Sequence, residues 1–245
     1  ITPIKDDLDK ILAFAYDNIH FGNIVKGVLY RFYKSTAFGD DALLRANEFL
    51  KTSLANYFQV RKLCTENSYQ YLFFSHGIYC TWEASTSYCH KNKIPFICYD
   101  SGKKKGTINF NINQPSPDWS FNDAWERYSD RQLSNDEEKM VDQYLGEREL
   151  QKGDVYSYNS VERNNDINSV KQSLGIQPHA KVITIFTNLI WDAANVARDI
   201  AFSSAMDCIE QTIKYYRQNG NVHILIRCHP AEKVLGTQQR YGNLI

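Results

Sequence analysis

The sequence lacks an excess of charge of either sign. Lys and Arg together number 28, Asp and Glu also number 28, and the formal net charge is therefore zero. A protein that binds nucleic acids through their phosphates usually presents a strongly basic surface, so this balance argues against a nucleic-acid partner. No apolar run approaches the roughly 20 residues of a membrane helix, and no signal-peptide pattern follows Ile1.

Several motifs of common enzymes are also absent. The chain contains neither Gly-x-x-x-x-Gly-Lys-Ser/Thr nor Gly-x-Gly-x-x-Gly. These are the usual sequence motifs for binding nucleoside triphosphates and dinucleotides, so their absence argues against both functions. Gly-x-Ser-x-Gly is missing, which weakens an α/β-hydrolase interpretation. The 6 cysteines form no Cys-x-x-Cys pair, and no His/Cys cluster has zinc spacing. We therefore expect free thiols in a reducing compartment, no metal site and no cofactor.

The composition is otherwise that of a folded globular protein, with 43% apolar and 23% charged residues. Apolar residues recur at helical spacing near the start, and short continuous apolar runs typical of buried parallel strands follow. Helices are predicted over residues 6–15, 40–63 and 83–92, and strands over residues 71–75 and 94–99. A strand, a helix and a strand within about thirty residues make a βαβ unit, whose parallel strands end at one edge of a sheet.

The middle of the chain carries turn-forming residues. Residues 101–133 include Gly102, Gly106, Pro115 and Pro117 together with several Asn and Ser residues, all of which favour turns. Ser134 followed by Glu137 is a capping-box pattern, which predicts a helix over 135–150. The polar stretch 153–168 is the best candidate for an interdomain connector.

A second βα pattern starts at residue 181. Its β-branched residues predict a strand over 181–187, then a long helix over 193–218 and a further strand over 222–227. The expected fold class is therefore α/β, with two Rossmann-like domains that face a cleft: residues 1–152 with their helical start, a connector over 153–180, and the beginning of a C-terminal domain over 181–245. A doubly wound sheet usually has about five or six strands, so this fold is expected to be incomplete in the chain.

Polar side chains follow three of the predicted strands. Ligands of open α/β sheets bind beyond the carboxyl ends of the strands, which makes these segments candidate sites. They are Ser75-His76-Gly77, Thr187-Asn188 with Trp191-Asp192, and Arg227-Cys228-His229-Pro230-Ala231-Glu232. In the last segment a guanidinium can bind phosphate oxygens, and a carboxylate can accept hydrogen bonds from sugar hydroxyls. A strand-end turn with a local ion pair is the alternative for His229 and Glu232.

Two parts of the sequence resemble bacterial capsule-polysaccharide biosynthesis glycosyltransferases. One is Val182-Ile-Thr-Ile-Phe-Thr-Asn-Leu-Ile-Trp-Asp-Ala-Ala194 together with Ile226-Arg-Cys-His-Pro-Ala-Glu232. The other is Ser75-His-Gly-Ile-Tyr-Cys-Thr-Trp82, with Ile94-Pro95 and Tyr99-Asp-Ser-Gly102, which is similar to the N-terminal domain of the same group. The resemblance covers about residues 71 to 235 and is carried by short motifs.

This resemblance implies a GT-B fold, with the acceptor on the N-terminal domain, a nucleotide-sugar donor on the C-terminal domain, and a transfer that needs no metal. His229-Pro230 is similar to the His-Pro pair that contacts donor phosphate in bacterial sialyltransferases and related Kdo transferases. The expected donor-binding residues are Thr187, Asn188, Trp191, Asp192, Arg227, His229, Pro230 and Glu232. The sequence departs from the family at Glu83, where a small residue is expected, and lacks the donor-domain elements that should follow the His-Pro strand.

Sugar transfer also needs a base that removes a proton from the acceptor hydroxyl. The candidates are His76, Asp100 and Glu83, with Glu83 last because the helix dipole already explains a carboxylate in a first helical turn. A buried imidazole satisfied by the backbone is the alternative for His76. Lys103, Lys104 and Lys105 follow Asp100 closely in the sequence. They can attract an anionic acceptor or a lipid phosphate, but a solvent-exposed turn with no ligand is the simpler interpretation.

The sequence thus predicts a glycosyltransferase that moves a sugar from a nucleotide-sugar donor to a surface (capsular) polysaccharide or glycolipid acceptor. We expect it in the cytoplasm, with a peripheral association at the inner face of the membrane. Two alternatives stay open. One is a non-catalytic carbohydrate- or nucleotide-binding module of a polysaccharide assembly or export complex, and the other is a nucleotide-sugar epimerase.

Overall fold

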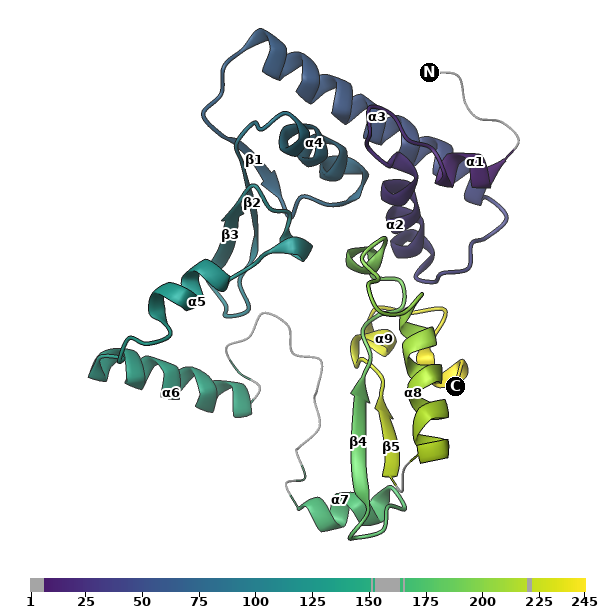
Figure 1. Ribbon diagram of the computed structural model, residues 1–245, viewed down its shortest axis with the longest axis vertical. Helices are drawn as coiled ribbons and strands as arrows, with labels where there is room; N and C mark the ends of the chain where they lie inside the picture. Colours follow the sequence, from purple (N-terminus) through teal and green to yellow (C-terminus); the bar gives the residue numbers. More distant parts are fainter. Residues whose placement is uncertain (1–6, 151, 153–163, 165, 220–221) are drawn as a thin grey trace. The chain divides into compact units, whose positions relative to one another are not determined.

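The computed structural model describes residues 7–150, 152, 164, 166–219 and 222–245 and has a mixed α/β structure with small sheets (Figure 1). The predicted α/β class is confirmed. The chain divides into two compact units, Ile1–Leu29 with Asp40–Ser157 and Tyr30–Gly39 with Tyr158–Ile245. Much of the polar stretch proposed as a connector, over 153–168, lies outside the described residues.

The first unit begins with helices, as predicted. They are α1 (Leu8–Leu12), α2 (Phe21–Tyr33), whose residues from Tyr30 onward belong to the second unit, and α3 (Ala42–Glu66). Leu50, Leu54 and Tyr57 form the buried side of α3, and the Tyr57 ring meets Phe21 of α2 edge to face, with 5.7 Å between the ring centroids. α3 has 25 residues, but no helix in the described part of the chain is long and apolar enough to cross a membrane.

A mixed three-stranded sheet follows in the order β1 (Leu72–Ser75), β2 (Phe96–Ser101) and β3 (Ile108–Ile112). β1 and β2 are parallel, joined through α4 (Tyr79–Lys91), which confirms the predicted βαβ unit. One sheet face, with Phe74, Phe96 and Cys98, is buried. β3 pairs antiparallel with β2 in a region that was expected to form only turns, so that prediction was wrong.

The first unit ends with a short 3₁₀ turn and two helices. These are η1 (Ser116–Asp118), α5 (Asn122–Tyr128) and α6 (Asn135–Glu149). The predicted capping box is present: Glu137 donates its backbone N–H to Ser134 Oγ, and the Glu137 carboxylate accepts the Ser134 N–H at 2.8 Å. Hydrogen bonds from Arg131 and Ser134 lower the pKa of Glu137 to about 2.

The second unit is built on two parallel strands, β4 (Lys181–Phe186) and β5 (Val222–Arg227), as predicted. The remaining elements are α7 (Ile167–Ser173), η2 (Ala193–Asn195), α8 (Ala205–Asn219), α9 (Ala231–Val234) and η3 (Tyr241–Asn243). The helix predicted over 193–218 is wrong in its first half. A single 3₁₀ turn capped by Asp192 occupies its start, Ala197 has a left-handed φ of 58°, and α8 begins only at Ala205.

Residues Tyr30–Gly39, expected in the N-terminal domain, belong to the second unit. The Gln239 side-chain oxygen accepts the Thr36 backbone N–H at 2.9 Å and the Thr36 hydroxyl at 2.6 Å, and the Gln238 N–H donates to the Lys34 carbonyl at 3.1 Å. Tyr30 packs against a buried cluster of Leu189, Trp191 and Ala231. An early segment of the chain is therefore part of the structure that carries the second strand ends.

Replacing Gly77 by alanine is expected to lower the free energy of unfolding by roughly 2–4 kcal/mol, because a left-handed backbone and overpacking both destabilise. Gly77 has a φ of +77°, and an added Cβ would lie 2.6 Å from Cys98 Sγ and 2.8 Å from the Cβ of Pro115. Gly106→Ala is the matched control, because Gly106 has the same φ but no atom within 4 Å of an added Cβ. Urea denaturation measures the free energy of unfolding of both variants. An equal decrease in the two variants contradicts close packing around Gly77.

Candidate functional site

The end of β1 turns directly into α4 through a strained backbone. His76 donates its backbone N–H to the Tyr99 carbonyl at 2.8 Å, so pairing with β2 continues one residue past the strand. His76 and Tyr79 then have positive φ values of 23° and 66°, as does Gly77 between them. Such backbone conformations of non-glycine residues are unfavourable by about 1–3 kcal/mol each, and they concentrate at functional sites.

The His76 ring is held by the backbone that follows it. Its Nδ1 atom accepts the Ile78 N–H at 3.3 Å, and Ile78 is the residue that caps α4. The ring also meets Tyr79 edge to face, with centroids 5.3 Å apart. Because Nδ1 is an acceptor, the neutral ring carries its proton on Nε2. In this tautomer the Nδ1 lone pair is occupied by the Ile78 N–H.

Asp100 lies beside His76 on the same sheet edge. Ser75 pairs with Tyr99 in the parallel register, which puts the residues that follow them at neighbouring strand ends. Asp100 is half-buried, and one carboxylate oxygen accepts the Ser101 N–H at 2.7 Å. Glu83 was expected in the first turn of a helix, but α4 begins at Tyr79, so this position is wrong and the helix dipole does not explain the carboxylate.

In the second unit, a threonine joins the ends of β4 and β5. Thr187 donates its backbone N–H to the Arg227 carbonyl at 3.1 Å, and its side-chain oxygen accepts the His229 N–H at 3.1 Å. The two predicted segments after these strands therefore meet, as their parallel pairing requires. Arg227, the last residue of β5, has an exposed side chain at this junction.

The His229 ring repeats the arrangement of His76. Its Nδ1 atom accepts the Ala231 N–H at 3.1 Å, at the start of α9. Pro230 caps this helix with helical φ and ψ angles of −61° and −26°, and it has no N–H that needs a partner. The neutral His229 ring therefore also carries its proton on Nε2, which suits it to donate a hydrogen bond to an anionic oxygen.

Asn188 and Asp192 form a small polar loop after β4. The Asn188 amide donates to one Asp192 carboxylate oxygen at 3.2 Å, and the other oxygen accepts the Ala194 N–H at 3.0 Å. The sequence predicts a long helix over 193–218, soon after the strand. That expectation is wrong, because α8 starts only at Ala205.

Two of the predicted donor-binding residues are buried in the second unit. Trp191 is 6% exposed, and its indole N–H donates to the Thr237 hydroxyl at 2.8 Å. Glu232 is 4% exposed, and its carboxylate accepts the Tyr241 backbone N–H at 3.2 Å. Thr237 and Tyr241 were not singled out from the sequence, since neither belongs to a motif or a regular pattern.

Three cysteine thiols of the two units are held in their protonated form. Burial raises the pKa of Cys98, in β2, and of Cys89, in α4, to about 12. Burial, with the nearby Glu232 carboxylate, also raises the pKa of Cys228. Among the described residues, no three His, Cys, Asp or Glu side chains gather in a way that could hold a metal ion.

Glu232→Ala is expected to lower the free energy of unfolding by about 1–3 kcal/mol, because it leaves the buried Tyr241 N–H without its acceptor. Glu232→Gln, which keeps an amide oxygen at that place, is expected to lose less than half as much. Thermal and urea denaturation of the two variants measure the difference. Unchanged stability in Glu232→Ala contradicts this structural role. Glu232 would then again be a candidate for ligand binding.

Comparisons of the chain with protein-family models, curated proteins and solved structures found no match. The function is therefore argued from the two strand ends themselves. Each combines a histidine whose Nε2 carries the proton with a second polar group, Asp100 in the first unit and Arg227 in the second.

Proposed function

We propose that the chain is part of a glycosyltransferase of the GT-B type, with two Rossmann-like domains. It transfers a sugar from a nucleotide-sugar donor to a surface polysaccharide or glycolipid acceptor without a metal ion. In this proposal the second unit binds the donor and the first unit binds the acceptor. The observation that carries it is the junction of β4 and β5, where Thr187 holds the His229 backbone beside the exposed Arg227.

The donor side follows from the charge of the leaving group. When the bond between the sugar's anomeric carbon and the phosphate oxygen breaks, negative charge grows on the nucleotide phosphate, and donors that are already oriented stabilise it. Nε2–H of His229 and the Arg227 guanidinium are two such donors, one neutral and one cationic. Asn188 lies on the adjoining loop and supplies a further polar group.

The acceptor side needs a base for the hydroxyl proton. His76 has its Nδ1 lone pair engaged with the Ile78 N–H, so its neutral ring cannot take up a proton, at Nδ1 directly or at Nε2 after tautomer exchange, without breaking that bond. Asp100 lies on the same sheet edge, and its carboxylate has lone pairs besides the one that accepts the Ser101 N–H. We therefore assign proton removal to Asp100 and orientation of the acceptor to His76, with Glu83 as the remaining candidate.

Nucleotide binding is the first test. Calorimetric titration of the full chain with UDP, CMP and GDP, in the presence of EDTA, is expected to give a dissociation constant for at least one of them. His229→Ala and Arg227→Ala should each weaken that affinity about tenfold or more, since a hydrogen bond to a charged group contributes roughly 1.5–3 kcal/mol. His179→Ala and Arg217→Ala, at exposed positions of the same unit, are the matched controls.

The outcomes separate the three functions. Sugar transfer or hydrolysis from a panel of nucleotide sugars supports the transferase. Nucleotide or sugar binding without any turnover favours a non-catalytic module instead. Conversion of the donor sugar with no acceptor present indicates an epimerase. No binding of any nucleotide, or equal effects of the site and control variants, contradicts the donor site.

Asp100→Asn tests the base. It is expected to lower kcat by about 100-fold or more, the usual scale for losing a general base, with the nucleotide affinity unchanged. His76→Ala should act more weakly on kcat and more on the acceptor KM, because it removes an orienting donor. A larger loss of kcat in His76→Ala than in Asp100→Asn reverses the assignment, and Glu83→Gln is then compared with both.

A further inference from the structure

One face of the sheet in the first unit is apolar and exposed. Residues directly opposite each other in the register, such as Tyr99 and Phe110, point to the same side. Phe73, Ile108 and Phe110 are 65%, 68% and 66% exposed. We call this surface the docking face; its residues are Phe73, Tyr99, Ile108, Phe110 and Ile112. No charged residue occupies the same alternating positions of the three strands.

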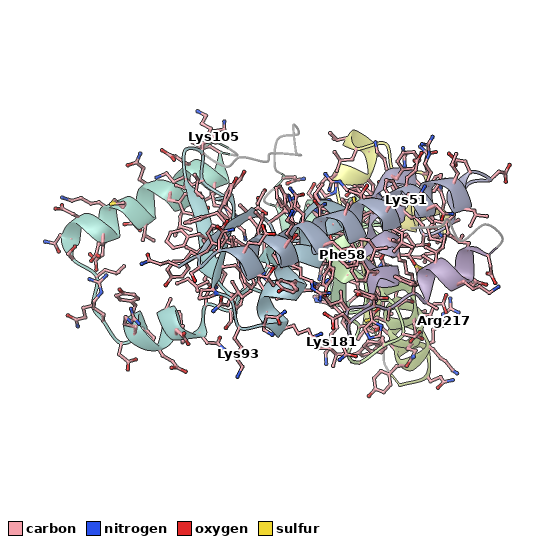
Figure 2. The ribbon with its side chains drawn as sticks, turned by 90° about the horizontal axis from the view of Figure 1, so that it is seen from above. Lys51, Phe58, Lys93, Lys105, Lys181 and Arg217 are labelled. Atoms are coloured by element: carbon pink, nitrogen blue, oxygen red, sulfur yellow. The ribbon has the colours of Figure 1, made fainter. Side chains whose placement is uncertain are left out.

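Three consecutive lysines form the hairpin tip next to this face. The Gly102 N–H donates to the Thr107 carbonyl at 2.9 Å and closes the turn between β2 and β3, which leaves Lys103, Lys104 and Lys105 exposed. Figure 2 shows Lys105 with its side chain directed away from the ribbon. Within the described residues, neither Lys103 nor Lys105 has an ion-pair partner.

Lys104 has a different neighbour. Its ammonium lies 5.9 Å from the ring centroid of Tyr144 on α6, a helix with more acidic than basic residues. Lys104 is therefore placed against an aromatic ring of its own unit. Lys103 and Lys105 are therefore the residues that can meet an anionic partner most directly.

We propose that the β2–β3 hairpin binds peripherally to an anionic phospholipid bilayer. Lys103 and Lys105 contact headgroup phosphates, while Ile108 and Phe110 enter the boundary between headgroups and acyl chains. A lysine near an anionic leaflet raises partitioning by about fivefold, and neither charge nor apolar area alone gives firm attachment. A second copy of the docking face offers the lysines no carboxylate, which favours the bilayer as the partner.

The proposal does not rest on the transferase function, and it is tested without any nucleotide sugar. The full chain is mixed with vesicles of phosphatidylcholine alone, or with about one quarter phosphatidylglycerol, and the bound fraction is measured by flotation. We expect at least about tenfold stronger binding to the anionic vesicles at low salt, and loss of that difference at high salt. No preference for anionic vesicles overturns the proposal.

Three double variants separate the contributions. Lys103→Glu with Lys105→Glu should weaken binding to anionic vesicles by more than about 25-fold, as two lysine contributions are lost. Ile108→Thr with Phe110→Thr should weaken it comparably. Lys51→Glu with Lys93→Glu, at exposed lysines away from the hairpin tip (Figure 2), makes the same change in net charge and should alter binding less than threefold.

Two other occupants of the docking face are recognisable in the same samples. If another part of the chain covers it, Ile108→Thr with Phe110→Thr lowers the melting temperature by several degrees, whereas substitutions on an exposed face are nearly neutral. If a second copy covers it, sedimentation shows a dimer that this variant abolishes. Either result without vesicle binding overturns the proposal, as does an equal loss in the Lys51 and Lys93 control. If Ile108→Thr with Phe110→Thr fails to fold, the vesicle binding of Lys103→Glu with Lys105→Glu tests the proposal.

Discussion

The hydrogen bond between a histidine ring and the backbone two residues further along constrains both strand ends. At His76 and at His229 the Nδ1 atom accepts an N–H at the start of the next helix, at 3.3 Å and 3.1 Å. The ring thereby satisfies one of the N–H groups that a helix start leaves without a partner, and it does so only with its Nδ1 lone pair. The proton of the neutral ring is then on Nε2, and each histidine is a donor. The separate roles given to Asp100 and Arg227 follow from this constraint.

Stability and recognition use different residues of the same short segment in the second unit. Glu232 and Trp191 are buried and hold Tyr241 and Thr237, so they attach the strand end to the rest of the unit. Arg227 remains at the surface, where a ligand can reach it. A carboxylate in a motif that resembles a donor site thus has a packing role here, and its partner is the Tyr241 backbone N–H rather than the local ion pair considered for Glu232.

The parts predicted best from the sequence are those that depend on local pattern. β1, β2, β4 and β5 follow from continuous apolar runs, and the capping box at Ser134 follows from two residues. β3 was missed although Ile108-Asn-Phe-Asn-Ile112 alternates apolar and polar residues, because the surrounding turn residues dominated the interpretation. The helix predicted from 193 failed because Asp192 caps only a single 3₁₀ turn there, and Ala197 then has a left-handed φ of 58°. The bonds of Thr36 to Gln239 join residues over 200 positions apart, and no local pattern contains them.

β3 also connects the two proposals for the first unit. β2 ends at Ser101 and continues directly into the lysine tip, so the tip extends from the sheet edge on which Asp100 and His76 lie. The chain returns along β3, and Pro115 then covers Gly77 beside the same edge. Asp100 alternates with Tyr99 along β2, so its side chain belongs to the sheet face opposite the docking face. The proposed bilayer contact and the candidate base therefore lie on opposite faces of the sheet, and the lysine tip is where the two faces meet.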